Sequence, residues 1–217
     1  MKPGGVFAGY DGAKEWILKY EGAGRDDVRV SVESERLLPE TPGGRVTIAP
    51  AIIKGRRWDW IIEKATELGA GVIAPVIAGR SVVKITDRDT DEKMVRWRRI
   101  AGAACAQCAG RAPEIRRPLS LEEFIEKSRG LPGRFVMMKT AGAEPFCKLT
   151  AGSRAGEKIL LVGPEGDWTE EEAEMIVASG FQPATLGETI LRSETAAIAA
   201  TLLAVCGGGG DYDNKEN

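Results

Sequence analysis

The sequence predicts an α/β fold with a mostly parallel sheet and helices on both of its faces. From residue 45 onward, apolar segments of strand type alternate with segments whose apolar residues recur at the helical period. One apolar run, at 71–77, is of the kind found in strands that are buried on both faces. The first 40 residues contain strand-like segments only. We therefore expect a small β region followed by a larger α/β domain.

The N-terminal region, residues 1–40, predicts three strands. Residues 5–22 read as two strands joined at Asp11-Gly12, a dipeptide typical of tight hairpins. In residues 28–38 three valines alternate with polar residues, which suits a third strand. Proline and glycine dominate residues 39–44, so this segment is expected to be a linker.

The α/β domain is expected to have strands at 45–53, 71–77, 114–117, 134–140, 158–163 and 183–187. Helices are expected at 56–69, 88–109, 120–129, 169–179 and 193–205. The first helix ends at Gly69, and its apolar face consists of Trp58, Ile61, Ile62, Ala65 and Leu68. Thr169 and Glu172 have the spacing of a capping box.

The C-terminal segment has two parts. Residues 193–205 are apolar almost all round, so this helix should pack in the core or against a partner. Residues 207–217 are glycine-rich and polar, and they predict a flexible tail.

The composition excludes several classes of protein. A net charge of -2 argues against a surface coated with basic residues, so any contact with nucleic acid must be local. The chain has no long apolar span and no apolar signal region, and its four cysteines are too few for a disulfide scaffold, so a soluble, cytoplasmic protein is expected. The chain contains no histidine, which excludes an imidazole base and histidine metal ligands.

The cysteines do not predict a metal site. Cys105 and Cys108 form a CxxC pair, which in other settings is a redox or zinc motif. The pair lies inside a predicted helix, and no second pair completes a set of four ligands. We therefore expect ordinary helix packing and no bound metal.

Basic residues form three clusters, at 54–57, 96–99 and 111–117. One such cluster alone would favour a solvated helix face. Three clusters in an otherwise acidic chain leave a local patch that contacts phosphates as an equal alternative. The candidate RNA-binding residues are Lys54, Arg56, Arg57, Arg96, Arg99 and Arg111.

The segment Gly163-Pro164-Glu165-Gly166 connects a predicted strand to a predicted helix. Such a turn lies at the carboxyl end of its strand, where open α/β sheets bind ligands. The P-loop pattern with its lysine is absent, so a nucleoside phosphate site is excluded. A plain connection between strand and helix is the simpler alternative.

A second unusual loop follows the last predicted strand. Residues 185–196 read TLGETILRSETA, with an apolar pair in the loop and an arginine and a glutamate at the start of a helix. This combination is suited to the wall of a pocket.

Three segments, GPEGDWTEEE, LGETILRSETA and KGRRWDWIIEKATELG, together resemble the RsmE-type ribosomal RNA uridine-N3-methyltransferases of the SPOUT superfamily. The segment CAQC followed by PEIRRP falls in the same order as in that family, and the likeness spans about residues 45–205. The resemblance implies a SPOUT-type methyltransferase domain with a C-terminal trefoil knot at 45–206, behind a partial PUA-like β domain at 1–40 that binds RNA. It also implies a homodimer, S-adenosylmethionine (SAM) as cofactor, and 16S ribosomal RNA in the small subunit as substrate.

The resemblance also assigns roles to residues. Backbone groups and apolar side chains of the knot loops would hold SAM; the matching residues are Leu161, Val162, Gly163, Pro164, Glu165, Gly166, Leu186, Gly187, Ile190, Leu191 and Thr195. Methylation at N3 requires removal of the imide proton, and Arg192 is the candidate cation that stabilises the resulting anion. Glu165 or Glu194 would orient the base or accept the proton. Alternatively, Arg192 and Glu194 form a structural charge pair at the helix terminus.

The chain departs from the family pattern at several positions. Asp167-Trp168 replaces the usual Gly-Phe, Thr189 stands where arginine is usual, and Ala106 where an acidic residue is usual. The first strands of the family's N-terminal domain have no counterpart, so we expect an open sheet edge and either a misassigned start or weaker RNA binding. Two other functions stay open: methylation of a different RNA, and a catalytically impaired RNA-binding module.

Overall fold

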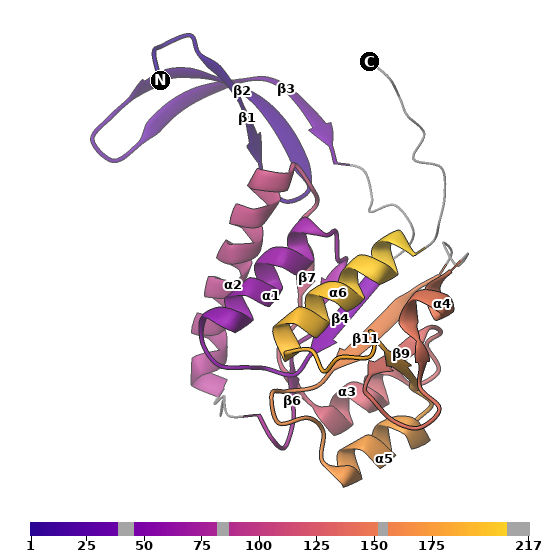
Figure 1. The fold of residues 1–217 in the computed structure, drawn as a ribbon. Coiled ribbons are helices and arrows are strands. Elements are labelled where there is room, and N and C mark those ends of the chain that lie inside the picture. Colours follow the sequence, from indigo (N-terminus) through magenta and orange to yellow (C-terminus); the bar gives the residue numbers. More distant parts are fainter. Residues whose placement is uncertain (39–45, 82–86, 152–155, 208–217) are drawn as a thin grey trace.

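The structure is a computed structural model that describes residues 1–38, 46–81, 87–151 and 156–207. A small antiparallel sheet at the N-terminus stands beside a larger α/β domain (Figure 1). The expected linker at 39–44 lies outside the described residues. So does the expected tail, apart from Gly207, which caps the last helix.

The N-terminal sheet consists of β1 (Val6–Tyr10), β2 (Lys14–Ala23) and β3 (Val28–Leu37), in that spatial order. The hairpin between β1 and β2 is confirmed, because the Asp11 carboxylate accepts the backbone N–H groups of Ala13 (2.9 Å) and Lys14 (2.7 Å). These hydrogen bonds also lower the pKa of the Asp11 carboxyl group. The third strand is confirmed as well, and β1 and β3 are the two edges of the sheet.

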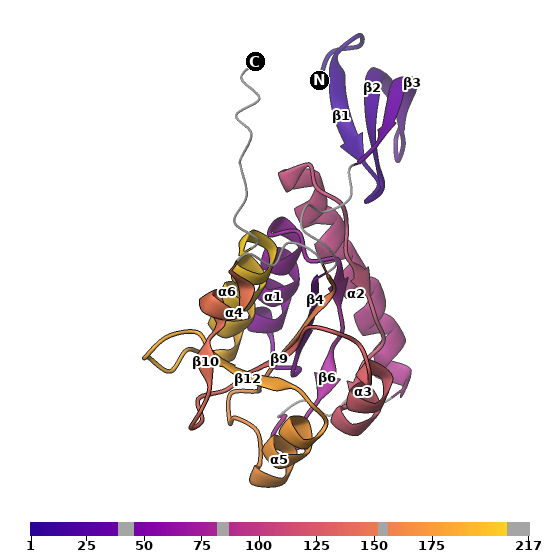
Figure 2. The same ribbon diagram turned by 90° about the vertical axis from the view of Figure 1, so that its right-hand side faces the viewer.

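One backbone hydrogen bond joins the two parts of the chain directly. The N–H of Ala112, which follows helix α2 (Asp87–Cys108), donates to the carbonyl of Gly12 in the hairpin, at 2.9 Å. Figure 2 shows the small sheet standing just beyond this end of α2.

The large sheet has seven strands in the order β10-β12-β9-β11-β4-β5-β7, and every pairing in it is parallel. The expected parallel α/β fold is therefore confirmed. The strands are β4 (Val46–Pro50), β5 (Val72–Ile73), β7 (Glu114–Ile115), β9 (Arg134–Met137), β10 (Glu144–Pro145), β11 (Lys158–Val162) and β12 (Gln182–Thr185).

The expected single strand at 71–77 is wrong. It is divided into β5 and β6 (Val76–Ile77), and β6 pairs with β8 (Leu119–Ser120) in a separate two-stranded sheet. Pro75 lies between the two pieces, and because proline has no N–H to donate, it interrupts the ladder there.

The described residues form six helices around the large sheet: α1 (Arg56–Glu67), α2, α3 (Leu121–Ser128), α4 (Phe146–Thr150), α5 (Glu170–Ala178) and α6 (Ser193–Cys206). Five of them were expected from the sequence. The capping box that begins α5 is confirmed, with Thr169 and Glu172 in the two reciprocal roles. Helix α4 was not expected, because five residues are too few to establish a period.

The core lies on both faces of the sheet. On β11, Leu160 and Val162 pack with residues of α1, α2 and α6, whereas Ile159 and Leu161 pack with residues of α3 and α5. This alternation follows from the period of two along a strand. Both views show α1 and α6 side by side on one face of the sheet, away from α3 and α5 on the other (Figures 1 and 2).

The expected burial of the helices is confirmed in part. In α1 the apolar face is buried, except that Leu68 is the C-cap residue and is only partly covered. In α6 one face is buried through Ala197, Ala200 and Ala204, but Leu202 on another side is 44% exposed. Helix α6 is therefore not enclosed by the residues that the structure describes.

None of the helices in the described ranges combines the length and the apolar character that a membrane crossing requires.

Candidate active site

A cavity of about 770 Å³ lies at the carboxyl ends of β9, β11 and β12. Ligands of open α/β sheets bind at this end of the strands. The lining residues come from the ends of these three strands, from the residues just after β9 and β11, from the loop before α6, and from α1 and α6. They are Arg57, Met137, Met138, Lys139, Val162, Gly163, Pro164, Glu165, Asp167, Ala184, Thr185, Leu186, Thr189, Ile190, Leu191, Arg192, Ser193 and Ala196.

The turn after β11, residues 163–168, is closed by a hydrogen bond from the Asp167 N–H to the Pro164 carbonyl, at 3.0 Å. Asp167 has a φ of 59°, in the left-handed region that favours glycine. Its carboxylate accepts the N–H of Trp168 at 2.8 Å. Aspartate is among the residues that tolerate this conformation, because its short side chain can bond to the local backbone.

Gly163 is needed because the backbone passes close to the buried ring of Trp168. A Cβ atom at residue 163 would lie 3.1 Å from the indole Nε1 of Trp168, closer than most real contacts. The indole ring belongs to the core on the α3 and α5 side of the sheet. The turn therefore links the core beneath it to the cavity above it.

Glu165 in this turn binds a cation from another element. Arg57 of α1 forms an ion pair with it, with 2.7 Å between Nη2 and Oε1. Both side chains line the cavity. The glutamate of the glycine-rich turn thus ties the first turn of α1 to the end of β11.

The loop before α6 forms the opposite wall. The ammonium group of Lys139 donates to the carbonyl of Glu188 at 2.5 Å, and the Thr185 hydroxyl donates to the carbonyl of Gly187 at 2.8 Å. Ile190 lines the cavity although 89% of its surface is exposed. An exposed apolar side chain at the mouth of a cavity is available to a ligand.

Arg192 and Glu194 lie in different environments. Arg192 is the N-cap of α6, lines the cavity and is exposed, and it forms no ion pair within the part of the chain that is described. Glu194 is 4% exposed, lies outside the lining, and has one carboxylate oxygen without a hydrogen-bond partner among the described residues. The alternative of a structural charge pair between them is therefore not supported.

The structure brings most of the expected cofactor-binding and catalytic residues together. The lining includes Val162, Gly163, Pro164, Glu165, Leu186, Ile190, Leu191 and Arg192. It leaves out Leu161, Gly166, Gly187, Glu194 and Thr195. Leu161 faces the opposite side of β11, and Gly166 packs against Arg80.

Sequence reasoning missed Met137, Met138, Lys139, Ala184, Thr185, Ser193 and Ala196 as site residues. The available signal was that a second expected strand, at 134–140, ends in Met-Met-Lys-Thr. Nothing in the sequence indicated that this strand lies next to β11.

The basic clusters contain both paired and unpaired side chains. Arg96 pairs with Asp59 at 2.5 Å, and Arg116 and Arg117 pair with acidic neighbours. Arg111 also has an interaction within the chain. Within the described ranges no ion pair is formed by Lys54, Arg56 or Arg99, which are exposed. Among the six candidate RNA-binding residues, these three are the cations available to a partner.

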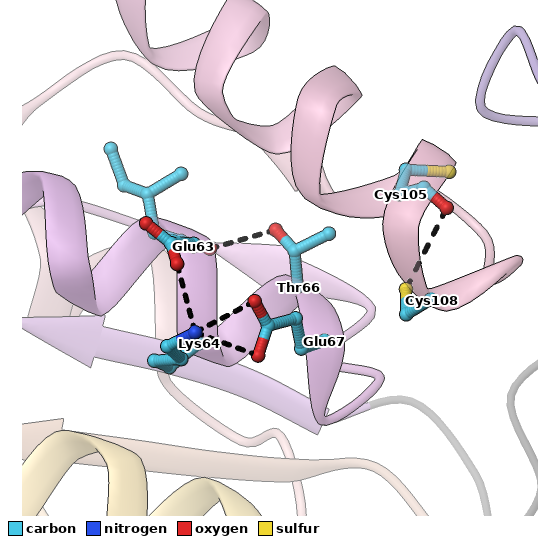
Figure 3. A network of polar contacts seen from close by, with 7 residues as sticks. Glu63, Lys64, Thr66, Glu67, Cys105 and Cys108 are labelled. Atoms are coloured by element: carbon cyan, nitrogen blue, oxygen red, sulfur yellow. Dashed lines mark hydrogen bonds and ion pairs between the residues drawn. The ribbon is translucent and has the colours of Figure 1, made fainter.

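The CxxC pair lies in the last turn of α2 (Figure 3). The Cys105 thiol donates to the carbonyl of Gly110 at 2.6 Å, and burial raises the pKa of this thiol. A raised pKa keeps the group protonated and unreactive. In the described part of the chain, no three side chains of the metal-binding types come together.

Figure 3 also shows Lys64 of α1, whose ammonium group forms ion pairs with Glu63 and Glu67. These carboxylates balance its positive charge within the helix.

Comparison with known proteins identifies similar chains. The family described as "RNA methyltransferase domain" matches residues 39–205. Ribosomal RNA small subunit methyltransferase E of Synechocystis sp. is 34% identical over 174 residues, which cover 79% of this chain and 54% of that protein. The protein of the same name from Bacillus subtilis is 33% identical over 162 residues, covering 72% and 63%. The matched segment therefore spans between about half and two thirds of these relatives.

Two solved structures are similar over nearly the whole chain. A putative methyltransferase from Legionella pneumophila, solved with bound SAM, has a TM-score of 0.88 and 30% identity, and the match covers 97% of this chain and 86% of that one. A ribosomal RNA small subunit methyltransferase E from Neisseria gonorrhoeae, bound to S-adenosyl methionine, has a TM-score of 0.79 and 26% identity, covering 93% and 82%.

The strained residue in the cavity wall provides a test of the turn geometry. Asp167→Asn should keep nearly the wild-type stability in urea unfolding, because asparagine tolerates a positive φ and its amide oxygen can still accept the Trp168 N–H. Asp167→Gly tolerates the positive φ but loses this hydrogen bond, so its stability should lie between those of Asp167→Asn and Asp167→Ala. Asp167→Ala should lower the free energy of unfolding by about 1 kcal/mol, because alanine is strained there and cannot accept the Trp168 N–H. Asp26→Ala, an exposed position with ordinary backbone, is the control. Equal stability of Asp167→Ala and wild type would contradict the left-handed conformation of residue 167 and its hydrogen bond to Trp168.

Proposed function

Because the chain belongs to the RNA methyltransferase domain family, we propose that it transfers the methyl group of SAM to N3 of a uridine in 16S ribosomal RNA of the small subunit. The observation that carries the proposal is the cavity at the carboxyl ends of β9, β11 and β12, lined by the glycine-rich turn and the loop before α6. Two similar structures, described above, were solved with SAM. A ribosomal RNA substrate implies a cytoplasmic protein.

The residues of the cavity fit SAM. The volume is in the range of small-molecule pockets, and the walls combine apolar side chains such as Val162 and Leu191 with backbone of the glycine turn. The lining carries charges of both signs, with cations at Arg57, Lys139 and Arg192 and carboxylates at Glu165 and Asp167. SAM also carries both signs of charge, on its carboxylate and on its ammonium and sulfonium groups. When bound, SAM supplies a methyl group activated by its sulfonium.

Arg192 is the residue that we assign to charge stabilisation. Loss of the N3 proton gives the uracil ring a negative charge, which a fixed cation stabilises in a site of low dielectric constant. Arg192 is an unpaired cation at the N-terminus of α6, where the helix dipole also favours an anion. The positive charge of Arg192 is repelled by the positive end of the helix dipole, so a bound anion would lower the electrostatic energy at this position.

The two glutamates are assigned different roles. Glu165 lines the cavity and is oriented by Arg57, so it is the carboxylate that we propose to contact the ligand or accept the proton. Glu194 is buried outside the lining, and we propose that it positions the first turn of α6, which carries Arg192.

A second function, an RNA-binding module with impaired catalysis, is favoured by one observation. Thr189 lines the cavity at a position where the resembled family usually has arginine. Calorimetric titration with SAM distinguishes the two functions, because an impaired module that has lost its cofactor site would give no binding heat.

The assembly that we propose is a homodimer through α1 and α6. These helices lie side by side on one face of the sheet (Figure 1), and their outer surfaces expose Trp60 and Leu202. We also propose that the C-terminal segment forms the trefoil knot of the family. This proposal is supported by the insertion of β12 between β9 and β10, which both precede it in the chain.

Arg192→Ala should lower the rate of methyl transfer about a hundredfold, as loss of one preorganised charge-stabilising group does, and leave SAM affinity unchanged. The assay measures methyl transfer to small subunits lacking the modification, and digestion to nucleosides should give 3-methyluridine. Arg129→Ala, which removes an exposed arginine far from the cavity, is the control. Methyl groups on cytosine or on a ribose oxygen would refute the uridine-N3 assignment.

RNA binding should depend on the unpaired cations at the start of α1. The double substitution Lys54→Ala/Arg56→Ala should weaken RNA binding and reduce the salt dependence of log K by roughly one unit for each phosphate that is no longer neutralised. SAM affinity should not change, because neither side chain lines the cavity. Arg57 is unsuitable for this test, since it also holds Glu165. An unchanged salt slope would exclude these two residues as cations that bind phosphates.

The wild-type protein should have twice the chain mass of 23.3 kDa in light scattering at micromolar concentration. Leu202→Glu should give the mass of one chain, because a buried charge in an apolar interface is strongly unfavourable. Leu131→Glu is the matched control, an exposed leucine on the other side of the sheet near α3. A wild-type protein with the mass of one chain would disprove the dimer.

A further inference from the structure

A short turn between β6 and α2 packs against the glycine-rich turn of the cavity from outside. This anchor turn, residues 78–81, is closed by two hydrogen bonds. The Ser81 N–H donates to the Ala78 carbonyl at 2.9 Å, and the Ala78 N–H donates to the Ser81 hydroxyl at 3.2 Å. None of its four residues belongs to the cavity lining. Its contacts with the cavity wall therefore have no direct part in holding a ligand.

Arg80 of the anchor turn binds two carbonyl groups of the cavity turn. Its Nη1 donates to the carbonyl of Gly166 at 2.8 Å and to that of Trp168 at 3.2 Å. Its aliphatic stem packs on Gly166, where an added Cβ atom would lie 3.4 Å from the arginine Cδ. The two carbonyls lie on either side of Asp167. The guanidinium therefore fixes the peptide groups around the residue whose backbone is strained.

Glu172 of α5 completes the connection. One of its carboxylate oxygens accepts the N–H of Thr169 at 2.9 Å, as the capping box requires, and the other accepts the N–H of Gly79 at 2.6 Å. The side chain is buried. A single carboxylate thus takes part in the N-terminal capping box of α5 and also binds the backbone of the anchor turn. Glutamine could not replace it, because an amide has only one acceptor oxygen.

We propose that Arg80 and Glu172 are positioning residues that hold the turn at 163–168 in the shape that binds SAM. The proposal rests on the proposed function, because it takes SAM as the occupant of the cavity. Left-handed backbone at a residue other than glycine persists only where its surroundings fix it. Pro164, Glu165 and Asp167 of this turn line the cavity, so relaxation of the turn would displace all three from the ligand at once. A preformed turn avoids the entropy loss of ordering the loop on binding.

Arg80→Ala should weaken SAM binding about tenfold in calorimetric titration, less than the full value of one charge-assisted hydrogen bond. Arg80→Lys should restore part of the affinity, because an ammonium group can still bind a carbonyl but lacks the planar fork. Arg129→Ala should bind SAM like wild type, because Arg129 is an exposed residue outside the cavity lining whose ion pair is with Glu126.

A second measurement needs no cofactor. In the absence of SAM, amide hydrogen exchange at Asp167 and Trp168 should be faster in Arg80→Ala than in wild type, because these two amides depend on the shape of the turn. Combining Arg80→Ala with Glu172→Gln should weaken SAM binding by less than the product of the single effects, since both act through one turn.

The outcomes separate the two proposals. If wild-type protein does not bind SAM, the proposed function fails, while the exchange data still report on the turn. If wild type binds SAM and Arg80→Ala binds it equally well, the positioning role is disproved even where exchange is faster. If Arg80→Ala does not fold, the comparison of Arg80→Lys with wild type decides in the same way.

Discussion

The turn at residues 163–168 depends on side chains from three other parts of the chain. Arg57 reaches it from α1, Arg80 from the segment after β6, and Glu172 through the start of α5. Inside the turn, Asp167 has a left-handed backbone, and Gly163 passes close to a buried indole. Such a turn has few stabilising contacts of its own, so its shape is determined by its contacts with the rest of the folded domain. This explains why a site at the end of one strand involves residues separated by more than a hundred positions.

The distribution of charge bears on the RNA substrate that we propose for this acidic protein. With a net charge of -2, long-range attraction is absent, and several arginines are neutralised by neighbouring carboxylates. The cations without such partners in the described chain include Lys54 and Arg56, beside the ion pair of Arg57 and Glu165, and Arg192 at the mouth of the cavity. Binding energy from such a surface would be local and concentrated near the cavity. That arrangement favours orientation of a substrate over general affinity for nucleic acid.

The sequence predicts the parallel α/β fold and the two loops of the site, because strand and helix periods and glycine turns are local signals. It does not predict the order of strands, and for that reason the end of β9 was missed. The resemblance assigns Leu161 to the site, but the side chain packs on the other face of β11. Both faces of a buried strand are apolar, so the sequence pattern does not show which face lies beside the cavity. Arg192 and Glu194 are two residues apart at the start of a helix, and side chains at that spacing do not face each other. Arg80 lies 86 residues from Gly166, and no local pattern links them.

Helix α6 connects the site to the assembly that we propose. Its first turn contributes Arg192, Ser193 and Ala196 to the cavity, while its buried face packs on the sheet through alanines. Small side chains let the helix lie close to the sheet but give it little interlocking surface. On the opposite face, Leu202 is left 44% exposed by the described residues of the single chain. A second chain on that face would fix the helix from both sides, and it would thereby fix the position of the arginine in the cavity. Formation of the site and association of two chains would then be coupled through one helix.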